Sequence, residues 1–266
     1  MDKKKLNKFC ILGVQISAID MNDACSLVKE AVLKRQKKYI CVCPVSTIME
    51  CKRNEKVLTS VNSADLVAPD GMPVVWLGKL KGYKDTEKVY GPDLMLEICR
   101  ISGDRGYKNY FYGSTFEVLN KLNRKLKSIF PDFPLTGMYS PPFRDLSPKE
   151  DEEIIGMINE ANPDVLWIGL GSPKQDIWMY EHRQKLNVPV IIGVGAAFDF
   201  IAGTKKQAPR WMQKIGMEWL FRLSSEPKRL WKRYAFGNTL FLYLITKELI
   251  INLLKKRTEN NEFLEK

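Results

Sequence analysis

The chain has 266 residues, of which 45% are hydrophobic and 27% charged, and its formal net charge is +11. This composition excludes disorder over most of the chain, and the length allows one large domain with a sizeable core. The charge is uneven, because residues 205–266 hold 14 Lys/Arg against 6 Asp/Glu, a net +8, which leaves +3 for the first 204 residues. A basic end on a nearly balanced body predicts an anionic partner for that end, such as nucleic acid, lipid headgroups or a phosphorylated substrate.

Short apolar runs alternate with helical patterns through the first 204 residues. The predicted strands are residues 9–17, 39–43, 66–68, 109–112, 135–138, 165–169 and 190–194. The predicted helices are residues 23–37, 47–61, 92–102, 115–130, 148–161 and 174–186. Several strands lack polar alternation, as expected for strands covered on both faces. The order predicts an α/β fold with a Rossmann-like, largely parallel sheet and helices on both faces.

The pattern changes after about Gly203. Trp211, Ile215, Trp219 and Leu223 recur every four residues and predict one apolar helical stripe flanked by basic residues. An apolar segment at 236–254 follows, closed by the basic residues 255–257. The segment suits an amphipathic element on an anionic membrane, and it equally suits a helix packed on the core or on a second subunit. We therefore divide the chain into an α/β core, residues 1–204, and a basic helical appendage, residues 205–266.

Other features limit the class of protein. The six cysteines include no C-x-x-C pair and there is one histidine, so we expect reduced, mostly buried thiols and no metal site. The basic start leads into a short apolar run without a cleavage-like site, which argues against export. The longest uncharged apolar run, residues 234–246, has 13 residues, fewer than the ~20 needed to span a bilayer. We expect a cytoplasmic body.

Five loops should meet at the ligand-binding edge of the sheet, where the carboxyl ends of parallel strands lie. They are residues 43–47, 69–71, 113–115, 169–175 and 193–199. Their glycines and helix starts suit a nucleotide or phosphate ligand. Neither G-x-G completes G-x-G-x-x-G, which argues against a dinucleotide fold.

Asp70 is the leading candidate carboxylate. Pro-Asp-Gly is ordinary turn chemistry, but Asp70 also follows an apolar strand at the ligand-binding edge, where it could take a proton from a hydroxyl. Asp199 follows a strand in the same way, although helix capping also explains it. His182 lies in a polar helix and is expected on a solvated face.

These motifs together resemble the WecG/TagA/CpsF glycosyltransferase family, from about Ile11 to Tyr234. The matching segments are residues 62–71 (NSADLVAPDG), 91–94 (GPDL), 169–175 (GLGSPKQ), 193–203 (GVGAAFDFIAG), 208–211 (APRW), 218–222 (EWLFR) and 226–229 (EPKR). The resemblance implies an inverting transferase that uses neither a metal nor another cofactor. Its donor would be a UDP-sugar of the N-acetylmannosamine type, and its acceptor an undecaprenyl-diphosphate-linked saccharide used in teichoic acid, common antigen or capsule synthesis. It would work peripherally on the cytoplasmic face of the plasma membrane, without nucleic acid as a partner, and copies could assemble through apolar helical faces.

The resemblance also implies roles for individual residues. Asp70 matches the catalytic base, and Gln175, Arg222 and Arg229 complete the catalytic set. Because the chain has no D-x-D pair for a metal, the C-terminal arginines would neutralise the departing UDP. Arg222 and Arg229, with Lys232 or Arg233, belong to an appendage that closes over the site. The implied substrate-binding positions are Ser46, Thr47, Gly71, Gly91, Asp93, Gly113, Tyr139, Gly169, Gly171, Gly195, Asp199 and Arg233.

One loop departs from the family pattern. The family's first loop usually reads Thr-x-Asn, whereas this chain has Cys43-Pro44-Val45. The departure leaves the sugar and the acceptor open more than the reaction type. A hexosyltransferase that uses another UDP-sugar in exopolysaccharide synthesis is therefore an alternative, and a basic nucleic-acid-binding protein is the non-enzymatic one.

Overall fold

The computed structural model describes residues 6–264, and for residues 232–233, 252–253 and 255–264 it describes the backbone alone. The strands are β1 (Lys8–Ile11), β2 (Val14–Ser17), β3 (Lys38–Cys43), β4 (Leu66–Pro69), β5 (Asn109–Gly113), β6 (Leu135–Tyr139), β7 (Val165–Gly169) and β8 (Val190–Gly193). The helices of the body are α1 (Met21–Leu33), α2 (Val45–Arg53), α3 (Glu55–Asn62), α4 (Met72–Leu80), α5 (Gly91–Arg105), α6 (Phe116–Ile129), α7 (Pro148–Ala161), α8 (Lys174–His182) and α9 (Ala197–Ala202). Three further helices follow, α10 (Arg210–Lys214), α11 (Glu218–Ser225) and α12 (Pro227–Leu264).

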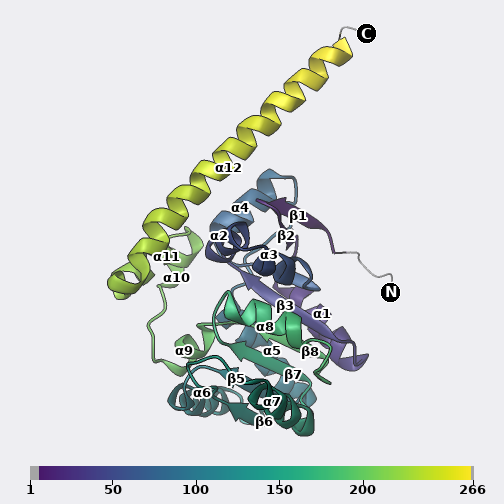
Figure 1. The fold of residues 1–266 in the computed structure, drawn as a ribbon, viewed down its shortest axis with the longest axis vertical. Coiled ribbons are helices and arrows are strands. Elements are labelled where there is room, and N and C mark those ends of the chain that lie inside the picture. The colour runs from purple at the N-terminus through teal and green to yellow at the C-terminus, as the bar shows by residue number, and fades with distance from the viewer. Residues whose placement is uncertain (1–5, 265–266) are drawn as a thin grey trace.

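The main sheet has the order β4-β3-β8-β7-β5-β6, and every neighbouring pair in it is parallel (Figure 1). Successive side chains of a strand point to opposite faces, so Ile40 and Cys41 of β3 enter two different cores. One core is shared with α1, α5, α6 and α9, and the other with α2, α3, α4, α7 and α8. The predicted α/β fold with helices on both faces of a parallel sheet is therefore confirmed.

The predicted strand at residues 9–17 is wrong, because this segment is a two-stranded hairpin outside the main sheet. β1 pairs with β2 in antiparallel register, and the turn between them holds Leu12 at φ 49° and Gly13 at φ 92°. Two consecutive left-handed residues reverse the chain, and glycine takes this conformation without a steric penalty.

The segment predicted as one helix at residues 47–61 is helical but is not continuous. It consists of two helices, α2 and α3, separated by Asn54. The backbone of Asn54 is extended, and its side-chain Oδ1 accepts hydrogen bonds from the N–H groups of Lys56 at 2.9 Å and Val57 at 3.4 Å. An asparagine in this position starts a new helix by satisfying its free N–H groups.

The predicted stripe of Trp211, Ile215, Trp219 and Leu223 is not on one helix. Gly216 has φ 74° and separates α10 from α11. A Cβ on Gly216 would lie 2.9 Å from Cη2 of Trp76, so the chain turns where only glycine fits against α4. The four residues do recur every four positions in the sequence, but the turn at Gly216 divides them between separate elements.

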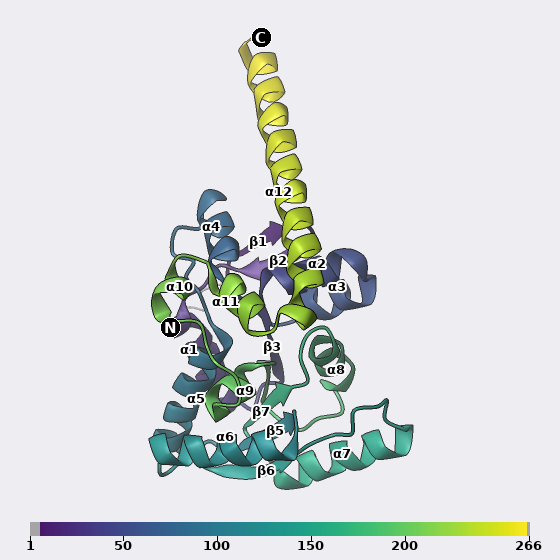
Figure 2. The same ribbon diagram turned by 90° about the vertical axis from the view of Figure 1, so that its left-hand side faces the viewer.

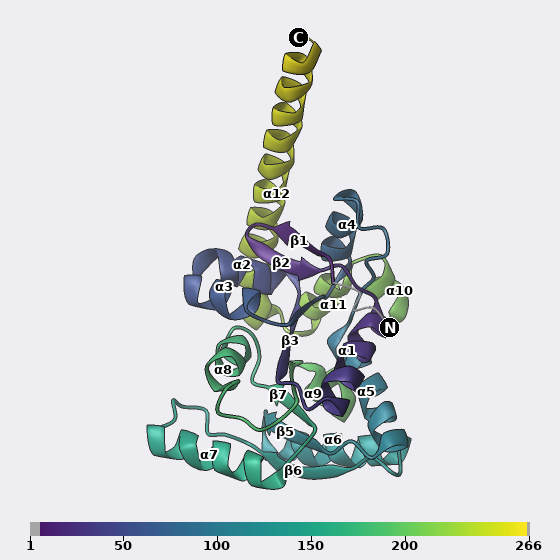
Figure 3. The same cartoon turned by 90° about the vertical axis from the view of Figure 1, so that its right-hand side faces the viewer.

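Helix α12 docks on the body with its first half and extends beyond it with its second (Figures 1 and 2). Leu230, Phe241 and Ile245 are buried, and Lys81 Nζ at the end of α4 lies 2.8 Å from Glu248 Oε1. The hairpin β1–β2 and helix α2 lie at the same end of the body (Figure 3). Among the described residues, no helix is both long and apolar enough to cross a membrane.

Candidate active site

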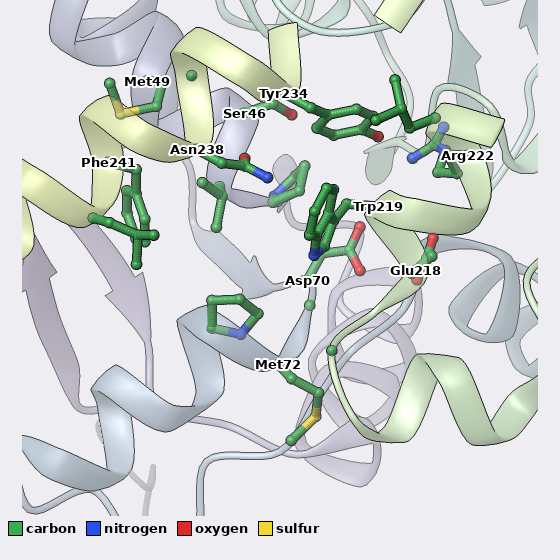
Figure 4. Close-up of a pocket in the computed structure, with 18 of the residues that line it drawn as sticks. Ser46, Met49, Asp70, Met72, Glu218, Trp219, Arg222, Tyr234, Asn238 and Phe241 are labelled. Carbon is green, nitrogen blue, oxygen red and sulfur yellow. The ribbon is translucent and has the colours of Figure 1, made fainter. Parts of the chain in front are cut away.

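A cavity of about 520 Å³ lies beyond the carboxyl ends of β3 and β4, walled by α2, α4, α11 and α12 (Figure 4). One end is polar, with Asp70, Glu218 and Arg222, whereas the other end holds Met49 and Phe241 (Figure 4). A cavity of this size, largely apolar with a few converging charged groups, is typical of a small-molecule site.

Asp70 reaches the cavity because β4 ends beside β3. Pro69 is in register with Cys43, and the backbone N–H of Asp70 donates to the carbonyl of Cys43 at 3.3 Å. Gly71 follows at φ 99° and turns the chain directly into α4. A residue with a side chain would be strained at this φ, so glycine allows the sharp turn that leaves Asp70 at the end of β4, facing the cavity.

Burial is the main influence on the pKa of Asp70, and the surrounding charges act on it in both directions. Burial raises the pKa of Asp70 to about 7, and the nearby Glu218 carboxylate also raises it, while Lys88 and Arg222 lower it. Lys88 and Glu218 form an ion pair of 3.0 Å with side chains only 14% and 17% exposed. Lys88 Nζ also lies 4.1 Å from the ring centroid of Tyr90. A carboxylate with its pKa near the working pH is suited to proton transfer.

A second group of residues lies along the same edge, at the ends of β5, β7 and β8. The connections leaving β5 and β7 run in opposite directions, toward β6 and β8, which makes their boundary a topological switch point. Gly113 and Gly169 are in register there, and a Cβ on Gly113 would lie 2.6 Å from the carbonyl carbon of Gly169. Side chains are therefore excluded from this point, where the two strand ends lie against each other. Glycine loops that lead into helices in this way are a common feature of phosphate and nucleotide sites.

Gln175 braces the glycine loops at this edge. Its Oε1 accepts from the N–H of Gly171 at 3.1 Å, and a Cβ on Gly193 would lie 3.0 Å from its Nε2. Gln175 is buried and is not part of the cavity lining. Its contacts are with the backbone of the glycine loops.

A partly buried hydrogen-bonded chain joins the two halves of the site. The Oγ1 of Thr47, in the first turn of α2, donates to Ser172 Oγ at 3.0 Å, and Ser172 Oγ donates to Asp176 Oδ2 at 2.6 Å. Burial raises the pKa of Asp176 to about 6, and its hydrogen bonds act in the opposite direction. Sequence reasoning missed Asp176, because a carboxylate in the first turn of a helix usually signals only a dipole contact.

The ion pair beside Asp70, Lys88 and Glu218, was not among the sequence candidates. Glu218 belongs to the motif at 218–222, so its motif was an available signal. Nothing in the sequence around Lys88 marks it, since it follows an ordinary loop after α4.

The remaining sequence candidates fall into two sets. Ser46, Gly71 and Arg222 line the cavity with Asp70. The others lie outside its lining. Three of them are held by neighbouring side chains: Asp93 forms an ion pair of 2.7 Å with Arg210, the Asp199 carboxylate accepts a hydrogen bond of 3.2 Å from the Thr204 hydroxyl, and Arg229 pairs with Glu226. The ring of Tyr139 stacks on that of Tyr112 with centroids 6.3 Å apart, Gly195 has φ 51°, and a Cβ added to Gly91 at the start of α5 would lie 3.6 Å from the Val194 carbonyl oxygen. The side chains of Lys232 and Arg233 are outside the described residues.

His182 is not on a solvated helix face, so that expectation is wrong. Its ring is buried and stacks on Trp178 with centroids 4.3 Å apart. Nδ1 lies 2.7 Å from the Trp178 carbonyl oxygen, and Nε2 lies 2.8 Å from Asp151 Oδ2. The histidine thus ties α8 to α7, and it does not line the cavity at Asp70.

The thiols behave as expected, since five of the six cysteines are buried and Cys10 alone is exposed. Within the part of the chain that the structure describes, no three His, Cys, Asp or Glu side chains gather closely enough to hold a metal ion.

A parallel α/β sheet with a glycine-lined switch point, a carboxylate titrating near neutrality and adjacent cations has the parts of a group-transfer enzyme. The sequence pattern of the Glycosyl transferase WecG/TagA/CpsF family matches residues 9–255. The chain belongs to this family and is a glycosyltransferase.

Three relatives bear the name N-acetylglucosaminyldiphosphoundecaprenol N-acetyl-beta-D-mannosaminyltransferase. The chain is 28% identical to that of Bacillus spizizenii over 69% of this chain and 69% of the relative. It is 29% identical to that of Bacillus subtilis over 65% of each chain, just under two thirds. It is 28% identical to that of Staphylococcus aureus strain MW2 over 73% of this chain and 74% of the relative.

Proposed function

We propose that this chain transfers an N-acetylmannosamine-type sugar from a UDP donor to a lipid-diphosphate-linked saccharide, with inversion at the anomeric carbon. The names of the relatives support the sugar and the acceptor. The observation that carries the proposal is Asp70, a carboxylate whose pKa burial raises to about 7, at the polar end of a cavity.

In the proposed reaction, Asp70 takes the proton of an acceptor hydroxyl. The hydroxyl oxygen then forms a bond to the anomeric carbon as the bond from that carbon to UDP breaks, and the electron pair leaves with the diphosphate. Asp70 holds the proton until it returns to solvent. The step needs no metal in this account, because guanidinium and ammonium groups balance the charge of the leaving diphosphate.

Arg222 is positioned to serve both halves of the site. It lines the cavity beside Asp70, and its guanidinium carbon lies 5.3 Å from the ring centroid of Phe200, in the helix that follows β8. A donor held by the glycine loops of β5, β7 and β8 would therefore present its diphosphate toward Arg222. Arg229 pairs with Glu226 outside the cavity lining, so of these two arginines Arg222 is the one that we assign to the leaving diphosphate.

Residues 205–266 form the second part of the proposed enzyme, a peripheral contact with the inner face of the membrane and a wall of the site. Phe236, Leu240 and Tyr243 are exposed on α12, next to basic residues of the same helix. Exposed apolar and basic residues on one helix suit an anionic lipid surface. Deleting residues 205–266 removes α11 and α12 from the cavity, and we expect loss of both transfer and vesicle binding.

The decisive experiment compares Asp70→Asn with the unmodified chain in a UDP-release assay, using UDP-N-acetylmannosamine and a short-chain lipid-diphosphate N-acetylglucosamine. We expect kcat to fall by about 10²–10⁴-fold with UDP binding preserved. Asp132→Asn, at an exposed position, is the matched control and should remain active. Near-normal turnover by Asp70→Asn would remove Asp70 from the role of base.

A second candidate donor follows from Val45. Val45 lines the cavity at the loop where the family usually carries a polar residue, and a valine side chain can form no hydrogen bond to a sugar there. A panel of UDP-hexoses and UDP-N-acetylhexosamines, scored by UDP release, distinguishes the two. Faster release with a UDP-hexose would favour a hexosyltransferase.

A further inference from the structure

The Asp70 cavity is elongated, and its two long walls run together from the polar end to the apolar end. Along α2, Ser46 lies nearer Asp70 and Met49 lies further away, and along α12 the same direction leads from Tyr234 to Phe241 (Figure 4). The cavity thus runs from the charged group at Asp70, Glu218 and Arg222 to the apolar side chains of Met49 and Phe241.

The far end of this cavity combines apolar side chains with the ion pair of Arg53 and Glu50, both of which line it. Met49 and Phe241 are buried in the wall, whereas Leu242 is 64% exposed at the mouth. Arg53, the last residue of α2, is exposed and also lines the cavity. Its Nη1 lies 3.3 Å from Oε1 of Glu50. The helix rises by 1.5 Å per residue, so Arg53 lies about 12 Å along α2 from Val45.

We infer that this end of the cavity is the subsite for the diphosphate and first isoprenoid units of the acceptor. The guanidinium of Arg53 meets the diphosphate, and the exposed Leu242 packs on the lipid. The inference rests on the proposed function and deepens it, because it assigns residues to the part of the acceptor that takes no part in the chemistry.

The arrangement fits an amphiphile better than a free sugar. A ligand whose hydroxyl meets Asp70 and whose phosphate meets Arg53 must extend along α2 past Met49, and its continuation then meets Leu242. A free sugar or nucleotide would leave the exposed Leu242 without an apolar partner. Since Leu242 stands at an open mouth, the rest of a long lipid can leave the cavity there.

Binding can be measured without sugar transfer, by isothermal titration calorimetry of the full chain with farnesyl diphosphate, inorganic diphosphate and farnesol. We expect farnesyl diphosphate to bind at least about tenfold more tightly than inorganic diphosphate, as burial of a few apolar carbons predicts. Equal affinities for the two would contradict a lipid subsite and would indicate a plain phosphate site.

Two matched pairs of variants test the residues. Leu242→Glu should weaken farnesyl diphosphate binding about tenfold or more, whereas Leu33→Glu on α1, 68% exposed and outside the lining, should not. Arg53→Gln should weaken farnesyl diphosphate but not farnesol, whereas Lys52→Gln, its neighbour outside this lining, should change neither. Equal losses within either pair would overturn the assignment, because they would indicate a general surface effect.

The two proposals fail separately. A chain that binds farnesyl diphosphate in this pattern but releases no UDP keeps the lipid subsite and loses the proposed function. A chain with equal kcat/KM for lipid-bearing and lipid-free acceptors keeps the proposed function and loses the lipid subsite.

Discussion

Replacement of Asp176 by asparagine should make the protein more stable at neutral pH, and the gain should depend on pH. Asp176 is completely buried, and burial raises the pKa of its carboxyl from 3.8 to about 6. The folded protein therefore binds this proton more tightly than the unfolded chain does. Stability is greatest below the unfolded pKa and falls as the pH rises through the folded pKa.

The magnitude follows from the shift. Each pKa unit corresponds to 1.36 kcal/mol, so ionising Asp176 should remove about 3 kcal/mol of stability between about pH 4 and pH 7. Asparagine has nearly the same shape and can still accept the hydrogen bond from Ser172, but it does not ionise. Any pH-independent effect of the amide, such as an imperfect fit near Cys41, shifts the whole curve without changing its slope.

The assay is urea unfolding of the unmodified chain and of Asp176→Asn at several values of pH between 4 and 8. We expect the difference in free energy of unfolding to move in favour of the variant by about 3 kcal/mol across that range. Asp132→Asn, at an exposed position, should show no such trend. Parallel curves for the unmodified chain and Asp176→Asn would refute the reasoning, because they would mean that the buried carboxyl does not change its charge in the folded protein.

Three further predictions concern other parts of the molecule. Native protein should react with a thiol reagent at Cys10 only, because the other cysteines are buried; rapid modification of a second thiol would contradict the packing. Gly113→Ala should destabilise the fold by more than about 1 kcal/mol in urea unfolding, because φ of Gly113 is 121° and the new Cβ would lie 2.6 Å from the carbonyl carbon of Gly169. Gly156→Ala is the control and should be neutral or stabilising, because its new Cβ would have no atom within 4 Å. Lys88→Met should move the acid limb of the pH–rate profile to higher pH, because Lys88 lowers the pKa of Asp70; a shift to lower pH would exclude Asp70 as the group that titrates.

Much of the body could be predicted because its signals are local. Uninterrupted apolar runs such as residues 165–169 are long enough to identify strands buried on both faces, and the predicted and observed strand coincide there. The places where a helix or strand is interrupted were harder to predict, because one or two residues decide where the chain turns. Asn54 splits a helical pattern by capping α3, and Leu12 with Gly13 folds an apolar run back on itself.

The candidate site was predictable only in part. Asp70 stood out because a carboxylate followed a strand, and the structure places it in the cavity. Lys88, Glu218 and Asp176 did not stand out, because their importance depends on neighbours distant in the chain. His182 was misplaced for the same reason, since only Trp178 and Asp151 together explain a buried histidine in a polar helix.

By itself the sequence determined the parallel α/β fold, the family and the position of Asp70, because periodicity, motif order and the residue after a strand are all properties of short segments. The tertiary structure decided which charges surround Asp70, that Thr47, Ser172 and Asp176 join the two halves of the site, and that α2 and α12 form a cavity that turns from charged to apolar. Burial and charge coupling depend on distance in space, and only the folded chain brings β4, α8, α11 and α12 within reach of one another.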